Sequence, residues 1–159
     1  MSAQPPKAHA LLSPHQDTIT NYMYLGLLPF FIGAFGPWIF ASQETGLTHL
    51  FLHYSTIIFS FLAGSLWAIA LFAHTENSAA FIARHIHAAI AFSLLPLAAY
   101  FLPLIYHIGL LMIGFLTLLF WEKLFLKTLY PAWYQALRHR VSFIVVACHM
   151  LALWNILHV

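Results

Sequence analysis

Five long apolar runs, separated by short polar segments, dominate the pattern of this chain. They cover residues 22–41, 50–73, 81–101, 103–121 and 141–157. Each run is close to the roughly 20 residues that an α-helix needs to cross the hydrocarbon core of a bilayer. None of them has a Lys, Arg, Asp or Glu at its centre. The pattern therefore predicts an all-α protein, with one membrane domain of five transmembrane helices at residues 21–159 and a flexible cytoplasmic tail at residues 1–20.

The third and fourth apolar runs are separated only around Leu102 and Pro103. Proline disfavours a helical conformation in the residue that precedes it. Together the two runs are also far longer than one membrane-crossing helix requires. We therefore expect a tight helical hairpin at this point rather than one long helix.

Composition excludes a soluble globular domain and gives no indication of nucleic-acid binding. The 159 residues are 62% hydrophobic and 6% charged, whereas about 25% of the residues in a soluble domain are charged. The net charge of +2 is small, and outside the membrane flanks no basic run is interleaved with aromatic residues. The single cysteine, Cys148, excludes an intrachain disulfide.

The basic residues predict the orientation of the five spans. All of them fall on one side of such a topology, namely Lys7, Arg84, Lys123, Lys127, Arg138 and Arg140. The segments on the other side, residues 42–49 and 101–107, contain no Lys or Arg. The positive-inside rule then places the N-terminus inside and the C-terminus outside, in a bacterial inner membrane.

The connection 122–140 combines aromatic and basic residues with Glu122 at its start. Trp133 and Tyr134 are suited to the headgroup level, so we expect an amphipathic stretch on the inner leaflet that is broken at Pro131. Simple anchoring is one interpretation of this stretch, and a site for lipid headgroups or a partner is the other. We expect Glu122 to pair with Arg138 or Arg140, while a proton-relay or substrate-binding carboxylate is the functional alternative.

Polar and small residues recur at helical spacing along the second span. They are His49, His53, Thr56, Ser60, Gly64, Trp67 and His74. In lipid, such residues usually face other helices, so we expect this stripe to face the bundle interior. Arg138, Ser142 and His149 are candidates for a matching face on the fifth span. The stripe is either a close-packed seam or the lining of a cavity or lipid groove.

Histidine is the main source of metal-binding chemistry, with eleven residues in the chain. His49 and His53 are four residues apart, so their rings project from one helix face as a divalent metal such as zinc requires. His107 is a candidate third ligand and Glu44 or His158 a fourth, on the outer side. Interfacial histidines that only bind water and headgroups are the commoner outcome. No hydrolase or nucleotide-binding motif is present, so we expect a protein that is not an enzyme.

Three sequence blocks carry a resemblance to a known family: YLGLLPFFIGAFG in the first span, YSTIIFSFLAGSLWAIAL in the second, and YPAWYQALRHRVS before the fifth. Together they resemble a bacterial inner-membrane family of unknown function that also contains mitochondrial transmembrane protein sixty-nine. The family pattern corresponds here to Tyr54, Ser60, Phe61, Gly64, Trp67, Glu122, Pro131, Trp133, Tyr134 and Arg138. The chain departs from it at Ala63 and Leu66. The resemblance implies a compact five-helix membrane protein with no established activity.

These observations predict a small protein of envelope or lipid homeostasis that binds lipid through its polar seam. Its expected partners are the phospholipid bilayer and anionic lipid headgroups. One alternative is a periplasm-facing protein that binds a divalent metal through its histidines. A second is a small transporter or proton-coupled carrier that uses His149 and Glu122. A homodimer is compatible with these interpretations, but no GxxxG motif proposes a dimer face.

Overall fold

The computed structural model describes residues 13–72 and 79–158, and all regular secondary structure within them is helical. The elements are η1 (Ser13–His15), α2 (Gln16–Leu25), α3 (Leu28–Ile39), η2 (Ala41–Gln43), α4 (Glu44–Phe72), α5 (Ala79–Tyr100), α6 (Leu104–Phe125) and α7 (Ala132–His158). Five segments of the described chain are long and apolar enough to cross a membrane, because α2 and α3 together form the first of them. This confirms the predicted all-α class and the five spans. The hairpin is also present, since α5 ends at Tyr100 and α6 begins at Leu104.

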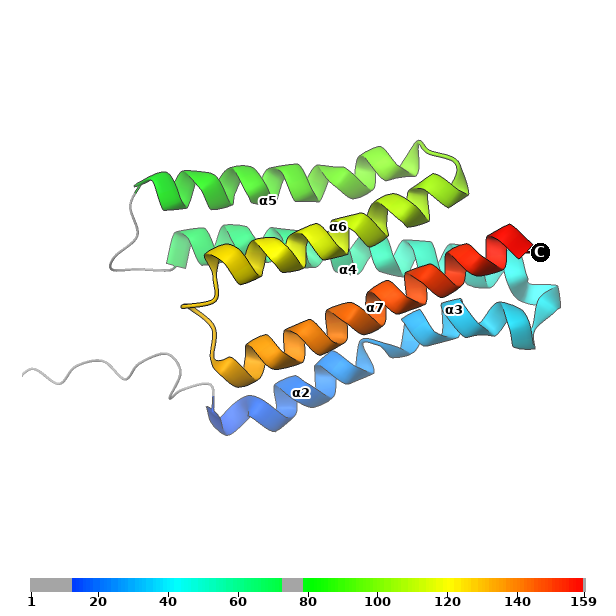
Figure 1. Cartoon of the computed structure of the whole chain (residues 1–159), viewed down its shortest axis with the longest axis horizontal. Helices are drawn as coiled ribbons and strands as arrows, with labels where there is room; N and C mark the ends of the chain where they lie inside the picture. Colours follow the sequence, from blue (N-terminus) through cyan, green and yellow to red (C-terminus); the bar gives the residue numbers. More distant parts are fainter. Residues whose placement is uncertain (1–12, 73–78, 159) are drawn as a thin grey trace, which may run out of the picture.

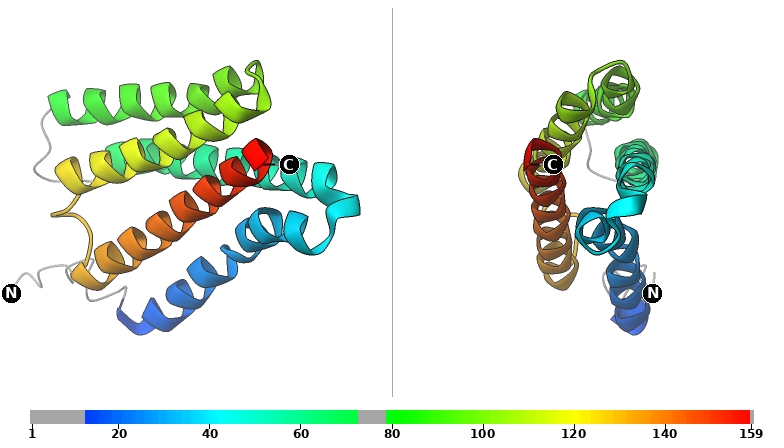
Figure 2. Two further views of the ribbon diagram at one scale, coloured as in Figure 1. Left: turned by 45° about the vertical axis from the view of Figure 1, so that its right-hand side comes forward. Right: turned by 90° about the vertical axis from the view of Figure 1, so that its right-hand side faces the viewer.

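The five spans form a closed ring in which each helix packs on the next. α4 contacts α3 and α5, α6 contacts α5 and α7, and α7 returns to α3. Viewed end-on in Figure 2, α6 and α7 make one layer, while α4 and the first span make the other. α2 begins at the end of the bundle opposite to the end of α7 (Figure 1), as an odd number of crossings requires.

The first span is interrupted between α2 and α3. Pro29 is the second residue of α3, where its ring lacks an N–H and clashes with the carbonyl of Leu25, the last residue of α2. The Leu27 amide instead donates to the Tyr24 carbonyl at 3.0 Å, in a tighter turn. α2 therefore follows a different direction from α3 (Figure 1) and packs on α7.

The core is built largely from aromatic and branched side chains at the middle of the ring. Phe30 packs edge-on against Phe51 and Phe115, with ring centroids 5.8 and 6.2 Å apart. Phe59 adds a similar contact with Phe115 at 5.2 Å. Many large apolar residues lie on the outside of the bundle instead, among them Ile57. That distribution suits a molecule whose surroundings are lipid tails rather than water.

The buried face of α4 differs from the face predicted for its polar stripe. The buried residues of α4 are Phe51, Leu52, Ser55, Phe59, Ala63, Leu66 and Ala70. Four members of the stripe are exposed, namely His49, His53, Gly64 and Trp67. Two are half-buried, Thr56 and Ser60, and His74 lies outside the described residues. The prediction that this stripe faces the interior is therefore wrong for its four exposed members. Close van der Waals fit decides helix packing in lipid, and here the large phenylalanines fill the interior.

Two predicted irregular segments are largely helical. Of the connection 122–140, residues 122–125 complete α6 and residues 132–140 open α7, so the amphipathic stretch is not a separate surface segment. The polar residues of this stretch can still lie at the ends of membrane-spanning helices. Arg138 is neutralised by its ion pair inside the bundle, and long basic side chains can extend to the lipid headgroups. Residues 13–20 of the predicted tail belong to η1 and α2, and residues 1–12 lie outside the described part.

Candidate functional site

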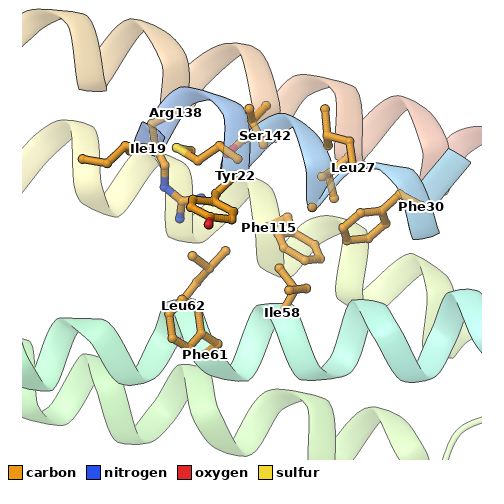
Figure 3. A pocket seen from close by; sticks show the side chains of 14 residues that line it. Ile19, Tyr22, Leu27, Phe30, Ile58, Phe61, Leu62, Phe115, Arg138 and Ser142 are labelled. Atoms are coloured by element: carbon orange, nitrogen blue, oxygen red, sulfur yellow. The ribbon is translucent and has the colours of Figure 1, made fainter. Parts of the chain in front are cut away.

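A pocket of about 350 Å³ lies between α2 and α4, beside the break in the first span. α3, α6 and α7 complete its wall, and Figure 3 shows side chains from these helices converging on it. The lining residues are Ile19, Tyr22, Met23, Gly26, Leu27, Phe30, Ile58, Phe61, Leu62, Phe115, Arg138, Val141, Ser142 and Val145. Two of them, Tyr22 and Phe61, have 71% and 72% of their surface exposed. The pocket therefore communicates with the surroundings of the bundle.

Polar groups are confined to one part of the pocket. Arg138 and Ser142 project from α7 and Tyr22 from α2, and Figure 3 shows Arg138 and Tyr22 at the opposite end from Phe30. Apart from the Gly26 backbone, the remaining lining residues are apolar. A mostly apolar cavity with a few polar groups at one end is the usual form of a small-molecule site.

Arg138 forms a buried, two-pronged ion pair with Glu122 of α6. Its Nε donates to Glu122 Oε2 at 2.9 Å and its Nη2 donates to Oε1 at 2.8 Å. The two side chains are only 8% and 5% exposed. This geometry is the strongest arrangement that arginine and carboxylate adopt. It confirms the predicted pairing of Glu122 with an arginine.

The connection between α6 and α7 covers this ion pair. Gln135 donates from Nε2 to the Lys127 and Tyr130 carbonyls, at 2.6 and 2.9 Å, and so closes the turn. The Tyr130 and Tyr134 rings pack 5.1 Å apart beside it. Burial raises the pKa of the Tyr130 phenol, and the neighbouring Glu122 carboxylate raises it further. Tyr130 is therefore a neutral, protonated neighbour of the ion pair.

His149 lies fully buried behind the apolar end of the pocket. Its ring packs against Phe30, Phe51 and Phe115, with centroids 6.0, 4.7 and 5.3 Å away. Nδ1 lies 2.8 Å from the Val145 carbonyl, which can only accept, so Nδ1 carries the proton and donates. The buried Nε2 has no hydrogen-bond partner among the described residues.

Two polar side chains satisfy backbone carbonyls of the first span. Tyr54 of α4 donates its hydroxyl to the Gly26 carbonyl, at the break, over 2.8 Å. Asn155 of α7 donates from Nδ2 to the Ala34 carbonyl of α3 over 2.9 Å. Both bonds join the first span to the bundle, and the Tyr54 bond satisfies a carbonyl at the break in that span.

The structure brings together only some of the residues predicted for a lipid site or cavity. Arg138 lines the pocket, Glu122 pairs with it, and Tyr54 contacts the break. Gly64 and Trp67 instead line a separate groove of about 280 Å³ between α4 and α5. Three further predicted residues, Ser60, Trp133 and Tyr134, are half-buried and do not line the main pocket.

Several residues of the pocket were not predicted as site residues. Tyr22, Met23 and Phe30 on the first span and Ile58 and Leu62 on α4 are ordinary apolar or aromatic positions in an apolar run. The available signal was Pro29, which follows Gly26 inside the first run and predicts an interruption there. An interruption alone does not show that the two halves diverge enough to open a pocket.

The histidines predicted to bind metal are only partly assembled. The His49 and His53 rings stack with centroids 6.2 Å apart on the exposed side of α4. His107 is buried on α6 and faces Tyr100 at 6.5 Å, while Glu44 is the first residue of α4. Within residues 13–72 and 79–158, no group of three or more His, Cys, Asp or Glu side chains could hold a metal ion. A zinc site on these residues stays a prediction.

Comparison with known proteins gives a family but no described activity. The model of a family described as "Protein of unknown function (DUF3429)" matches residues 16–154. No curated protein and no solved structure matches the chain. The match runs from the first residue of α2 almost to the end of α7, and so includes the pocket and the Glu122–Arg138 pair. The chain therefore belongs to this family of unknown function, as its three sequence blocks predicted.

Proposed function

We propose that this protein binds a membrane lipid in the pocket between α2 and α4. One hydrocarbon chain occupies the apolar part, and the polar end of the lipid meets Arg138 and Ser142. The observation that carries this proposal is the pocket itself, which is apolar along most of its length and polar at one end. Its volume of about 350 Å³ falls in the range of roughly 300–1,000 Å³ that is usual for small-molecule sites.

The position of the pocket favours a ligand that arrives from the bilayer. Phe61 lines the pocket and is strongly exposed on the outside of α4, next to the outward-facing Ile57. In a five-span protein this exposed apolar surface is the part that lipid tails contact. A hydrophobic ligand can therefore enter sideways, without passing through water.

The interruption of the first span also supports a binding role. Non-helical backbone at membrane depth is tolerated where it is enclosed by protein or lines a cavity, and discontinuous helices frequently form binding sites in membrane proteins. Gly26 and Leu27 at this interruption both line the pocket. Pro29 thus weakens one helix at the position where the pocket is formed.

A role in envelope or lipid homeostasis of a bacterial inner membrane fits this binding activity. Four exposed basic residues lie where α5 begins, α6 ends and α7 begins, namely Arg84, Lys123, Lys127 and Arg140. These helix ends share one end of the bundle (Figure 1). Anionic headgroups attract such residues from the inner leaflet. The exposed basic residues therefore anchor and orient the bundle, while the pocket takes the bound lipid.

The proposal is tested by filling the pocket from α4. We expect Ile58→Trp to abolish labelling of the pocket by a lipid that carries a photoactivatable group on its acyl chain, because Ile58 lines the cavity. Labelled peptides from protein in lipid nanodiscs are identified by mass spectrometry. In the wild type, label is expected on the segments that contain Met23 and Leu62.

Ile57→Trp is the matched control for this experiment. Ile57 is the preceding residue and is 63% exposed on the outside of α4, so the same substitution there leaves the pocket open. Equal labelling of the wild type, Ile57→Trp and Ile58→Trp would show that the lipid binds elsewhere. Label spread over all outward-facing segments of the wild type would likewise contradict the proposal.

The alternative functions have less support. For the carrier, Glu122 is already engaged by Arg138, and His149 is enclosed by three phenylalanine rings. For the metal-binding protein, the stacked pair of His49 and His53 is the supporting feature. Elemental analysis of purified protein decides that alternative, because stoichiometric metal that is lost in a His49→Ala/His53→Ala variant would favour it over lipid binding.

A further inference from the structure

The polar end of the pocket contains a charged side chain but no net charge. Arg138 is the one charged residue that lines this pocket. Its positive charge is neutralised by Glu122 in the buried ion pair. Ser142 and Tyr22, the other polar side chains of the lining, are uncharged hydroxyl groups. A ligand that enters this pocket therefore meets a neutral site.

The same end of the pocket is rich in hydrogen-bond donors. A guanidinium group has five N–H donors, and the bonds to Glu122 use one on Nε and one on Nη2. No other hydrogen bond of Arg138 is present among the described residues, so its remaining N–H groups can serve a ligand that reaches them. The Ser142 and Tyr22 hydroxyls can also donate. The site is thus suited to an oxygen that accepts hydrogen bonds.

Burial decides between a charged and an uncharged acceptor. An anionic headgroup beside the Glu122–Arg138 pair would leave one net negative charge in a low-dielectric site, next to the Glu122 carboxylate. Removing an uncompensated charge from water costs several kcal/mol, as an order of magnitude. An uncharged carbonyl gives up far less hydration and still receives the hydrogen bonds.

We propose that the ligand of this pocket is an acylglycerol, bound by one acyl chain and by its uncharged ester carbonyl. This inference rests on the proposed lipid-binding function and adds the class of the lipid. Arg138 lies two turns into α7, close in sequence to the exposed Arg140, at the basic end of the bundle where lipid headgroups are expected. Ester carbonyls of glycerolipids join the headgroup to the acyl chains, so a carbonyl can reach the Arg138 donors near this end of the bundle. The acyl chain extends from there toward Phe30.

The first test compares headgroups on wild-type protein, so it needs no variant to fold. A photoactivatable monoacylglycerol labels the pocket in nanodiscs of uncharged lipid, and unlabelled competitors displace it. The competitors are a monoacylglycerol, an ionised fatty acid with the same chain, and an isoprenoid quinone. We expect the monoacylglycerol to compete at a concentration about tenfold or more below that of the fatty acid, since tenfold corresponds to about 1.4 kcal/mol.

The second test reverses the preference through Glu122→Gln. The amide keeps the shape of the side chain but removes the charge that balances Arg138. Arg138 then becomes an uncompensated cation, and the fatty acid should gain at least about tenfold relative to the monoacylglycerol. Asp17→Asn is the matched control, because Asp17 is an exposed carboxylate on α2 outside the pocket lining. The ranking should not change in that variant.

The outcomes separate this inference from the proposed function. If pocket labelling is present but the fatty acid or the quinone is the stronger competitor in the wild type, the acylglycerol assignment is wrong and lipid binding stands. A ranking that Glu122→Gln and Asp17→Asn alter equally would also overturn the assignment. If no probe labels the pocket of the wild type, the proposed function itself fails.

Discussion

Single polar side chains hold the irregular part of this bundle in place. Tyr54 is half-buried on α4, and its hydroxyl reaches the Gly26 carbonyl at the break of the first span. Its ring also packs 5.0 Å from the Phe30 ring. Tyr54 thus joins α4 to the break and to α3.

Tyr54→Phe removes this hydrogen bond and keeps the ring. We expect the free energy of unfolding to fall by roughly 0.5–1.5 kcal/mol, because the half-buried Gly26 carbonyl loses its donor. Tyr106→Phe is the control, since Tyr106 is 65% exposed on α6. Reversible unfolding in mixed micelles, followed by circular dichroism, measures both variants. An equal effect of the two substitutions would contradict the assigned role of Tyr54.

Residues differ in how far the sequence predicted their positions. The pairing of Glu122 with an arginine followed from the rarity of charge in the chain, because a carboxylate at a membrane boundary needs a partner. His149 lies near the middle of the fifth apolar run, residues 141–157. The three phenylalanine rings around His149 come from three other helices. No pattern within one helix predicts such a contact.

Close approach of α3 and α4 explains which face of α4 is buried. A methyl carbon added at Gly33 of α3 would lie 2.6 Å from Phe51 Cβ on α4 and 3.1 Å from Phe51 Cα. Small residues permit such backbone proximity in membrane bundles. The contact turns the Phe51 face of α4 inward, and the His49 and His53 rings therefore remain outside.

Gly33→Ala should push α3 and α4 apart. Because the added carbon meets the base of the Phe51 side chain rather than a flexible tip, we expect a loss of about 1–3 kcal/mol in stability. Gly109→Ala on α6 is the matched control, since no atom lies within 4 Å of the added carbon there. That variant should gain up to about 1 kcal/mol from helix propensity. Thermal unfolding in detergent should therefore show shifts of opposite sign, and a stable Gly33→Ala variant would contradict the close contact.

At the scale of the whole molecule, the ends of the bundle differ in charge. The exposed basic residues lie at the end where α6 leads into α7, including Lys123, Lys127 and Arg140. The α5–α6 hairpin, which includes Leu102, lies at the other end (Figure 1). The positive-inside rule predicts that the basic end faces the cytoplasm.

Cysteine labelling tests this orientation in intact cells. We expect a membrane-impermeant thiol reagent to modify Leu102→Cys from the periplasm and to modify Lys127→Cys only after the cells are opened. Both positions are exposed, and the native Cys148 is buried and serves as an internal control for background labelling. The reverse pattern would place the basic end outside and would contradict the predicted topology.

The sequence by itself determined the helical class, the five spans, the hairpin at Pro103 and the pairing of Glu122 with an arginine. These features follow from local rules, because a chain in lipid must satisfy its backbone within helices and must neutralise buried charge. Only the tertiary structure decided which face of α4 is buried, how far α2 diverges from α4, and that Arg138 faces a pocket. These features depend on packing between helices. In a membrane, the interior of the bundle and its lipid surroundings are both apolar, so no alternation of apolar and polar residues shows which face of a helix is buried.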